Sequence, residues 1–265
     1  MVTKPSSRNF ADKPKADSAF PFHFKNIQFI MANIITRHIP NSITCCNLIC
    51  GCMATGAAFH GQYHWAVLMI VLGAVFDFFD GMSARALGVS SPIGKELDSL
   101  ADVVTFGVAP SAIIFYLFHE VVYPEVLQPF KSYIPYSAFL LAAFSALRLA
   151  KFNLDTRQTN QFIGLPTPAN ALFWSSLILG EHAFLVSPRF NAVFLFLFMF
   201  LFCMLLVAEI PLIALKFKDY SWANNRAKYI FLAGCLPCFF LGTSCFAAII
   251  MWYMLMSMIS NRFRL

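Results

Sequence analysis

Four aspartates stand close together in a part of the sequence that is otherwise apolar enough to lie in a membrane. Asp77 and Asp80 are three residues apart, so they share one face of a helix. Asp98 and Asp102 are four apart and share a face in the same way. Carboxylates in or near hydrocarbon are costly, and four converging ones also repel one another. A divalent cation compensates both effects, and oxygen ligands suit Mg²⁺, Mn²⁺ or Ca²⁺.

Two separate helices are predicted to carry these acids. Ser91-Pro92 is typical of a helix N-cap followed by the first helical residue, so one helix ends and another begins between the two aspartate pairs. Ion pairing between helices is the alternative role for such acids. The segment contains a single arginine, Arg85, which cannot neutralise four carboxylates. We therefore favour a divalent-cation site.

The composition indicates that most of the chain lies in a membrane. Hydrophobic residues make up 59% of the 265 residues, charged residues 12%, and the mean hydropathy is +0.67. A soluble globular protein is far more polar. The length allows several spans of about 20 residues each. We expect an all-α polytopic membrane protein with no nucleic-acid partner.

Alternating apolar and polar stretches predict about eight transmembrane helices. The predicted spans are 40–59, 63–85, 94–118, 133–149, 164–184 and 190–215, with two short spans inside 229–259.

The last apolar run, 229–259, is long for one helix and short for two. Pro237 and Gly242 allow either a kink or a turn there. If the run forms two spans, both termini lie on one side of the membrane, together with 17 of the 19 lysines and arginines. Lys131 and Arg189 then lie on the other side. The positive-inside rule therefore favours eight spans, with the aspartates facing the cytoplasm.

The spans lie within a single predicted domain with short flanks. Residues 1–20 are polar and predicted to be flexible. Residues 21–39 place isoleucines and a methionine at helical spacing, which predicts an amphipathic helix lying on the membrane surface. The transmembrane domain is predicted to cover residues 40–260, and residues 261–265 form a cytoplasmic tail.

The aspartate segment also carries a sequence motif. From residue 77 to residue 102 it reads D-x2-D-G-x2-A-R-x8-G-x3-D-x3-D, where x is any residue. This motif resembles, position for position, the signature of the CDP-alcohol phosphatidyltransferases. The resemblance covers about residues 40–215 and implies a six-helix core of that family, here followed by two C-terminal spans.

This resemblance implies roles for the four acids. In the family, aspartates bind two divalent cations, Mg²⁺ or Mn²⁺, which clamp the diphosphate of a CDP-linked lipid. Asp77, Asp80 and Asp98 resemble metal ligands. Asp102 resembles both a ligand and the general base that takes a proton from the attacking hydroxyl.

The resemblance also implies a binding site for CDP-diacylglycerol. Gly81 and Ala84 are small where the nucleotide must approach the backbone, and Arg85 supplies a guanidinium for phosphate. The expected CDP-diacylglycerol-binding residues are Asp80, Gly81, Ala84, Arg85, Gly94 and Thr44.

Two further segments, 146–153 and 162–170, resemble the integral-membrane phosphatidylserine synthases. They imply L-serine as the acceptor alcohol, although that subgroup often has arginine where this chain has Lys151. Glu209 is predicted to lie about 9 Å deep in the sixth span, where a buried acid is either a functional residue or the partner of an arginine in a structural ion pair. The expected serine-binding residues are Arg148, Lys151, Asn153 and Glu209.

Other functions remain open at this point. A sister enzyme would use inositol, inositol phosphate or glycerol phosphate, and cations such as Arg148 and Lys151 would suit a phosphorylated acceptor. A divalent-cation transporter would also use buried aspartates, but transporter sites usually lie near the midplane between repeated halves. The resemblance implies a homodimer, and we expect it in the bacterial cytoplasmic (inner) membrane with the active site facing the cytoplasm.

Overall fold

The computed structural model describes residues 20–89, 91–155, 163–213 and 221–263. This part of the chain is helical, with two isolated β-bridges and no strand. The elements are α1 (Phe20–Phe59), α2 (Tyr63–Leu87), α3 (Pro92–Asp102), the π-helix η1 (Val103–Val108), α4 (Ala109–Glu120), the 3₁₀ turns η2 (Glu125–Phe130) and η3 (Ile134–Ala138), α5 (Phe139–Leu154), α6 (Thr167–Leu185), α7 (Ala192–Val207), α8 (Trp222–Cys238), the 3₁₀ turn η5 (Phe239–Ser244) and α9 (Cys245–Phe263).

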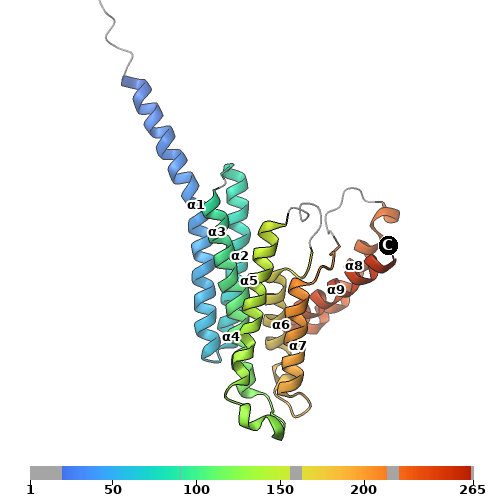
Figure 1. Cartoon of the computed structure of the whole chain (residues 1–265). Helices are drawn as coiled ribbons and strands as arrows, with labels where there is room; N and C mark the ends of the chain where they lie inside the picture. The colour runs from blue at the N-terminus through green and yellow to red at the C-terminus, as the bar shows by residue number, and fades with distance from the viewer. Residues whose placement is uncertain (1–19, 90, 156–162, 214–220, 264–265) are drawn as a thin grey trace, which may run out of the picture.

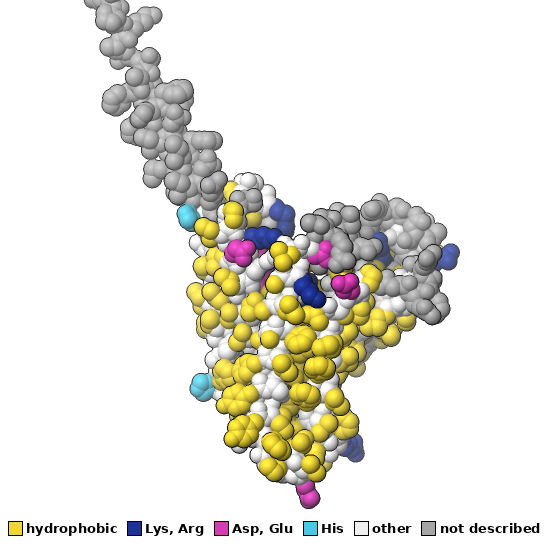
Figure 2. All heavy atoms as spheres, in the orientation of Figure 1, with side chains coloured by type: hydrophobic (Ala, Val, Ile, Leu, Met, Phe, Trp, Pro, Cys, Tyr) yellow, Lys and Arg dark blue, Asp and Glu magenta, His cyan; other side chains and the backbone are white. Residues whose placement is uncertain are grey.

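Several helices can cross a membrane. By length and composition, five segments of the described residues qualify: His38–Phe59, Tyr63–Leu87, Pro92–Glu120, Ile134–Leu154 and Asn225–Ser260. The helix α7 is apolar but shorter. Figure 1 shows α1 to α7 gathered in one bundle, with α8 and α9 at its side. Hydrophobic side chains cover the middle of the face seen in Figure 2. The chain is therefore an all-helical integral membrane protein.

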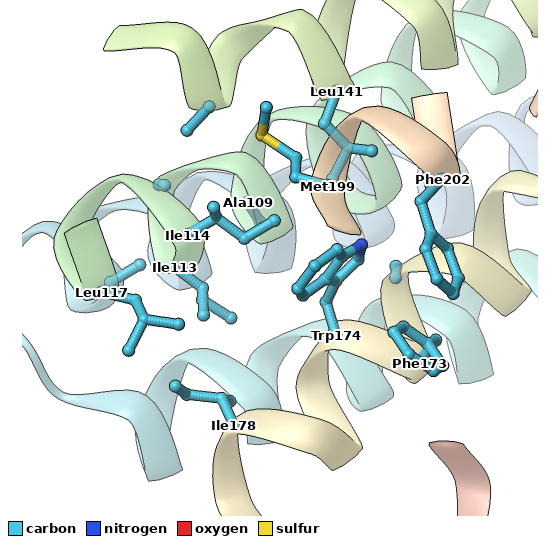
Figure 3. Packing of buried hydrophobic residues seen from close by; sticks show 14 of the residues in the cluster. Ala109, Ile113, Ile114, Leu117, Leu141, Phe173, Trp174, Ile178, Met199 and Phe202 are labelled. Carbon is cyan, nitrogen blue, oxygen red and sulfur yellow. The ribbon is translucent and has the colours of Figure 1, made fainter. Parts of the chain in front are cut away.

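The centre of the bundle is packed by aromatic and aliphatic side chains (Figure 3). Phe173 of α6 stacks on Phe202 of α7 with ring centroids 4.1 Å apart, and Trp174 lies edge-on against the same ring at 5.5 Å. Lipid tails are as apolar as these side chains, so close packing rather than escape from water favours helix association here.

The junction between the two aspartate-bearing helices forms as its sequence predicts. The helix α2 ends at Leu87 and is capped by Gly88, whose φ of 62° is left-handed; the amides of Gly88 and Val89 donate hydrogen bonds to carbonyls of the last turn. Ser91 then caps α3 by accepting a hydrogen bond of 2.9 Å from the amide of Gly94. Pro92 occupies the first turn, as expected.

The third predicted span is interrupted just after Asp102. The helix changes to the π-helix η1 before continuing as α4. Single π-turns inside helices occur frequently at functional sites. The turn packs tightly against α1, where Thr105 Oγ1 donates a 3.0 Å hydrogen bond to the carbonyl of Asn47. Residues from η1 onward are therefore fixed against α1 at the level of the aspartates.

The sixth predicted span, 190–215, is too long. The helix α7 ends at Val207, and the chain then runs extended to a bridge between Pro211 and Ile163. Gly164, which has a φ of 74°, donates its amide hydrogen to the carbonyl of Ile210 beyond the end of α7. The amide of Leu165 donates to the carbonyl of Leu205 in the last turn of α7. Because Pro211 disfavours helix before it, the apolar residues after Val207 do not extend α7.

The C-terminal apolar run folds back on itself. Gly242, with a φ of 59° and a ψ of −126°, breaks the helical path in η5. Trp252 Nε1 of α9 donates a 3.0 Å hydrogen bond to the carbonyl of Phe231 in α8, so residues on either side of η5 lie side by side. The elements α8, η5 and α9 are therefore a helical hairpin, called the C-terminal hairpin below.

At the N-terminus, α1 is one continuous helix that runs through the predicted boundary between residues 39 and 40. Pro40 lies inside it, and its carbonyl accepts a 3.0 Å hydrogen bond from Thr44 Oγ1. The surface position predicted for residues 21–39 stays a prediction. The predicted flexible stretch lies, except for Phe20, outside the described residues. At the other end, α9 runs to Phe263.

Candidate active site

Three of the four predicted acids converge between α2 and α3. Oxygen atoms of Asp77, Asp98 and Asp102 all lie within 4.8 Å of one another. Asp102 is 8% exposed, and the other two are partly buried. The helix–loop–helix geometry thus brings together carboxylates that are 25 residues apart in the sequence.

The side chain of Asp80, the fourth acid, contacts α1 instead of joining the group of three carboxylates. Its Oδ2 accepts a 2.5 Å hydrogen bond from Thr44 Oγ1 of α1, and it is only 6% exposed. It does not belong to the group of three, but it lines the same side of the bundle. Thr44 therefore holds Asp80 beside the other carboxylates.

Asn47 is a site residue that the sequence interpretation missed. Its Nδ2 lies 3.4 Å from Asp102 Oδ1, in position to donate a long hydrogen bond, and the residue is fully buried. Asn47 follows Thr44 by three residues, so both polar side chains face the aspartates from one side of α1. The sequence signal for Asn47 was its spacing of three residues from Thr44, which gives two polar side chains on one side of an otherwise apolar span.

The residues present fit a divalent cation. Oδ1 of Asp98 is buried and has no hydrogen-bond partner. Among the described residues, no lysine or arginine forms an ion pair with any of the four aspartates. A buried group of carboxylates with an unpartnered oxygen and no ion pair to a lysine or arginine among the described residues is a donor set for a hard cation.

A cavity of about 250 Å³ opens beside Asp80 and Asp98. Small residues shape it: a β-carbon on Gly94 would come within 2.9 Å of Asn41 Oδ1, so only glycine fits without displacing that side chain. The residues that line the cavity are Pro40, Asn41, Thr44, Asp80, Gly81, Ala84, Val89, Ser91, Gly94, Lys95 and Asp98. Five of the six residues expected to bind CDP-diacylglycerol therefore line one cavity, called the aspartate cavity below.

Arg85, the sixth of those residues, does not line the aspartate cavity but lies next to it. It is exposed one turn after Gly81 on α2, and its Nη1 is 3.4 Å from where a β-carbon on Gly81 would stand. The absence of a side chain at Gly81 thus leaves room for this guanidinium.

A second cavity, of about 290 Å³, lies between α5 and the end of α7. Arg148 lines it and is 7% exposed, with its guanidinium carbon 5.1 Å from the centre of the Phe152 ring. The helix α5, which carries Arg148, packs against η1, the turn that follows Asp102. The second cavity, called the arginine cavity below, therefore lies near the carboxylate group.

The other predicted acceptor residues occupy different places. Lys151 and Glu209 line the arginine cavity. Glu209 is exposed and lies after the end of α7, so its predicted depth inside a sixth span is wrong. The side chain of Asn153 instead donates a 2.7 Å hydrogen bond to Ser99 Oγ, which ties α5 to α3.

The fold and the site define a class: a helical membrane protein with buried carboxylates that fit a cation at one end of its bundle. Residues 37–216 match the model of the CDP-alcohol phosphatidyltransferase family, and the chain belongs to that family. Members of this family use divalent metals, which agrees with the chemistry of the aspartate group.

Three similar curated relatives carry the same name. The chain is 41% identical over 132 residues to a CDP-diacylglycerol–serine O-phosphatidyltransferase of Bacillus subtilis (strain 168), covering 50% of this chain and 70% of the relative. It is 34% identical over 143 residues to one of Helicobacter pylori (strain J99), covering 50% and 54%. It is 37% identical over 132 residues to one of Saccharomyces cerevisiae, covering 45% and 43%. These matches cover about half of this chain and between 43% and 70% of the relatives.

Proposed function

We propose that the chain is a phosphatidylserine synthase. It transfers the phosphatidyl group of CDP-diacylglycerol to the hydroxyl of L-serine and releases CMP. The observation that carries the proposal is the convergence of Asp77, Asp98 and Asp102 between α2 and α3, beside the α5 helix that lines the arginine cavity and packs against η1. The names of the relatives support serine as the acceptor.

The metal site is proposed to hold two divalent cations, Mg²⁺ or Mn²⁺, bound by Asp77, Asp80, Asp98 and Asp102. The close approach of three of these carboxylates and the buried, unpartnered Oδ1 of Asp98 support it. Bound cations offset the negative charge of the diphosphate and of the departing CMP. Thr44 limits the freedom of Asp80, which keeps that carboxylate near the others.

The aspartate cavity is proposed to bind the nucleotide end of CDP-diacylglycerol. Gly81, Ala84 and Gly94 leave space for it, and Arg85 at its margin provides a planar donor for phosphate.

Asp102 is proposed as the general base. It takes the proton from the serine hydroxyl as the serine oxygen forms a bond to the phosphatidyl phosphorus and the bond from that phosphorus to CMP breaks. A carboxylate beside cations is a weak base, so we expect proton transfer late in this step. Asn47 orients the Asp102 carboxylate through its hydrogen bond.

The arginine cavity is proposed to bind serine. Arg148 suits the serine carboxylate because its planar fork can donate two parallel hydrogen bonds. Lys151 adds positive charge, and Glu209 is a candidate partner for the ammonium group. Asn153 contributes by fixing α5 against α3 rather than from within the cavity.

We also propose the membrane arrangement: eight spans, both termini and the active site in the cytoplasm, a homodimer, and the bacterial inner membrane. The fold-back at Gly242 supports the division of the last apolar run into two spans. The domain limits 40–260, with a cytoplasmic tail at 261–265, are part of the same proposal.

Acceptor competition tests the reaction. Purified protein in detergent, with CDP-diacylglycerol and Mn²⁺ or Mg²⁺, is given radiolabelled serine together with inositol, inositol phosphate or glycerol phosphate. We expect serine to enter lipid only when CDP-diacylglycerol is present, and the other alcohols not to compete. Preferential use of a phosphorylated alcohol would indicate a sister enzyme. Metal uptake into sealed vesicles without lipid product would indicate transport.

A further inference from the structure

An apolar groove of about 770 Å³ lies between α6 and α7. Each helix contributes side chains at helical spacing, so each wall is one side of a helix. The α6 wall contains Leu177, Phe184 and Leu185, and the α7 wall contains Phe194, Leu197, Phe198 and Leu201. Figure 1 shows the connection between these two helices at the end of the bundle opposite α3. The groove, called the α6–α7 groove below, therefore starts at the end of the bundle away from the aspartates.

The α6–α7 groove is about as long as one leaflet is thick. From Leu185 to Leu177 the helix rises about 12 Å, and half of the hydrocarbon core is about 15 Å thick. Aromatic rings meet at its inner end, where Phe198 lies edge-on against Trp174 with ring centroids 5.5 Å apart. A transmembrane helix of another protein would continue through both leaflets. The length of the groove therefore matches a lipid better than a spanning helix.

The end of the groove near the α6–α7 connection carries one charge of each sign. Arg189 lies in the connection, lines the groove and is exposed. Glu181 of α6 lines the groove too, and its Oε1 accepts a 2.8 Å hydrogen bond from Ser244 Oγ of the C-terminal hairpin. In the part of the chain that the structure describes, Arg189 makes no hydrogen bond or ion pair, so it does not neutralise Glu181. Both charges are therefore available to a ligand.

We propose that the α6–α7 groove binds one zwitterionic glycerophospholipid of the surrounding bilayer, with its head group between Arg189 and Glu181. The planar guanidinium of Arg189 can donate two parallel hydrogen bonds to the lipid phosphate. A carboxylate near hydrocarbon is costly without a cation, and the lipid ammonium supplies one for Glu181. One acyl chain then lies between the two apolar walls.

This lipid is distinct from the substrate of the proposed reaction. Within the described residues, the groove and the aspartate cavity have no lining residue in common. Lipid tails gain no hydrophobic energy by moving from the bilayer into a groove, so the head group must provide the selectivity. One cation and one anion favour a head group that also carries one of each over a purely anionic one.

The test uses phosphatidylethanolamine with a photoreactive diazirine on one acyl chain. The full chain in phosphatidylglycerol nanodiscs with a trace of this probe is irradiated, digested and analysed by mass spectrometry. We expect label at residues 177–185 and 194–201 that is displaced by excess ordinary phosphatidylethanolamine and not by the same amount of phosphatidylglycerol. Equal displacement by both lipids, or by neither, would mean unselective contact with the bilayer. Absence of label there would mean that protein covers the groove. Each of these results overturns the proposal.

Two pairs of variants locate the lipid. Arg189→Gln should lower the labelling about tenfold through loss of a charge-assisted contact. Lys131→Gln, at an exposed lysine that does not line the groove, should leave it unchanged. Leu197→Trp fills the groove and should also lower the labelling, whereas Val193→Trp adds bulk at an exposed position of α7 outside the groove and should not. Equal effects within either pair would overturn the assignment. Labelling needs no turnover, so its failure would leave the proposed function standing.

Discussion

Thr44 of α1 and Asp80 of α2 are joined by a 2.5 Å hydrogen bond between buried side chains. Thr44 Oγ1 also lies 3.0 Å from the carbonyl of Pro40 in its own helix. The carboxylate of Asp80 is therefore held by a threonine hydroxyl that also lies within hydrogen-bond distance of the backbone of its own helix. The helix α1 carries none of the four aspartates, yet through Thr44 it holds Asp80 in position.

Thr44→Val should weaken this control. The variant keeps the shape of the side chain and removes the hydroxyl, so we expect turnover to fall about tenfold and the required Mn²⁺ concentration to rise, from the loss of a charge-assisted hydrogen bond. Ser42→Ala is the matched control, because Ser42 is exposed and bonds only to the carbonyl of its own helix. A titration of activity against Mn²⁺ measures both the turnover and the required Mn²⁺ concentration of each variant. An unchanged Mn²⁺ dependence in Thr44→Val would contradict the role.

The acids should separate into two groups by their effects. We expect Asp77→Asn, Asp80→Asn and Asp98→Asn to abolish turnover by weakening cation binding. Asp102→Asn should stop chemistry but leave CDP-diacylglycerol binding substantially intact, with a loss of about 10²–10⁴-fold. Lipid binding and turnover are measured on the same preparations. A rate above about a tenth of wild type in Asp102→Asn would be incompatible with a general base there.

Asn47 should act by positioning Asp102. Asn47→Ala removes the 3.4 Å hydrogen bond, so we expect kcat to fall about tenfold with little change in KM for CDP-diacylglycerol. Thr55→Val is the control on the same helix, because Thr55 bonds only to the backbone of α1. Saturation curves for each variant measure the split. A rise in KM at constant kcat would mean that Asn47 serves lipid binding instead.

Arg148→Lys should affect serine and not the lipid. Lysine keeps the charge but cannot reproduce the planar fork, so the KM for serine should rise by about 30- to 1,000-fold, equivalent to roughly 2–4 kcal/mol. The KM for CDP-diacylglycerol should stay nearly constant. Two saturation curves decide this. A shift in the lipid curve alone would assign Arg148 to the lipid phosphate.

Topology can be tested with single thiols. In a variant lacking the eight native cysteines, a cysteine placed after Arg262 should be shielded from an impermeant maleimide added to intact cells. A cysteine at position 131, in place of Lys131, should react and serves as the positive control. Outside labelling beyond Arg262 would rule out eight spans with a cytoplasmic C-terminus.

Local signals account for what the sequence predicted well. The caps at Gly88 and Ser91 depend on neighbouring residues, so the junction between α2 and α3 followed from the sequence. The end of α7 was missed because apolar residues continue past Val207, although Pro211 was a signal against helix. The spacing of Thr44 and Asn47 marked a polar side of α1, but it could not show that Asn47 contacts Asp102, which is 55 residues away.

The predicted acceptor site shows the same limit. Arg148 and Lys151 are three residues apart on α5, so helical spacing alone puts them on one side. Asn153 faces Ser99 on α3 instead, and Glu209 reaches the cavity from an extended segment. Both placements depend on how distant helices pack, which no local pattern encodes.

The π-turn η1 divides the third membrane-crossing segment into halves with different duties. In α3, which precedes the turn, the buried residues are Ala101 and Asp102 alone. In α4, which follows it, eight of the twelve residues are buried. The wider turn takes up an extra residue, so the two halves need not keep a common angular phase. Shortening it by one residue would rotate the aspartates by about 100° relative to α4 while leaving the hydrophobic length almost unchanged. The length of the η1 turn thus fixes the rotation of α3 relative to α4. That rotation determines whether the side of α3 that faces α2 carries aspartates or apolar side chains.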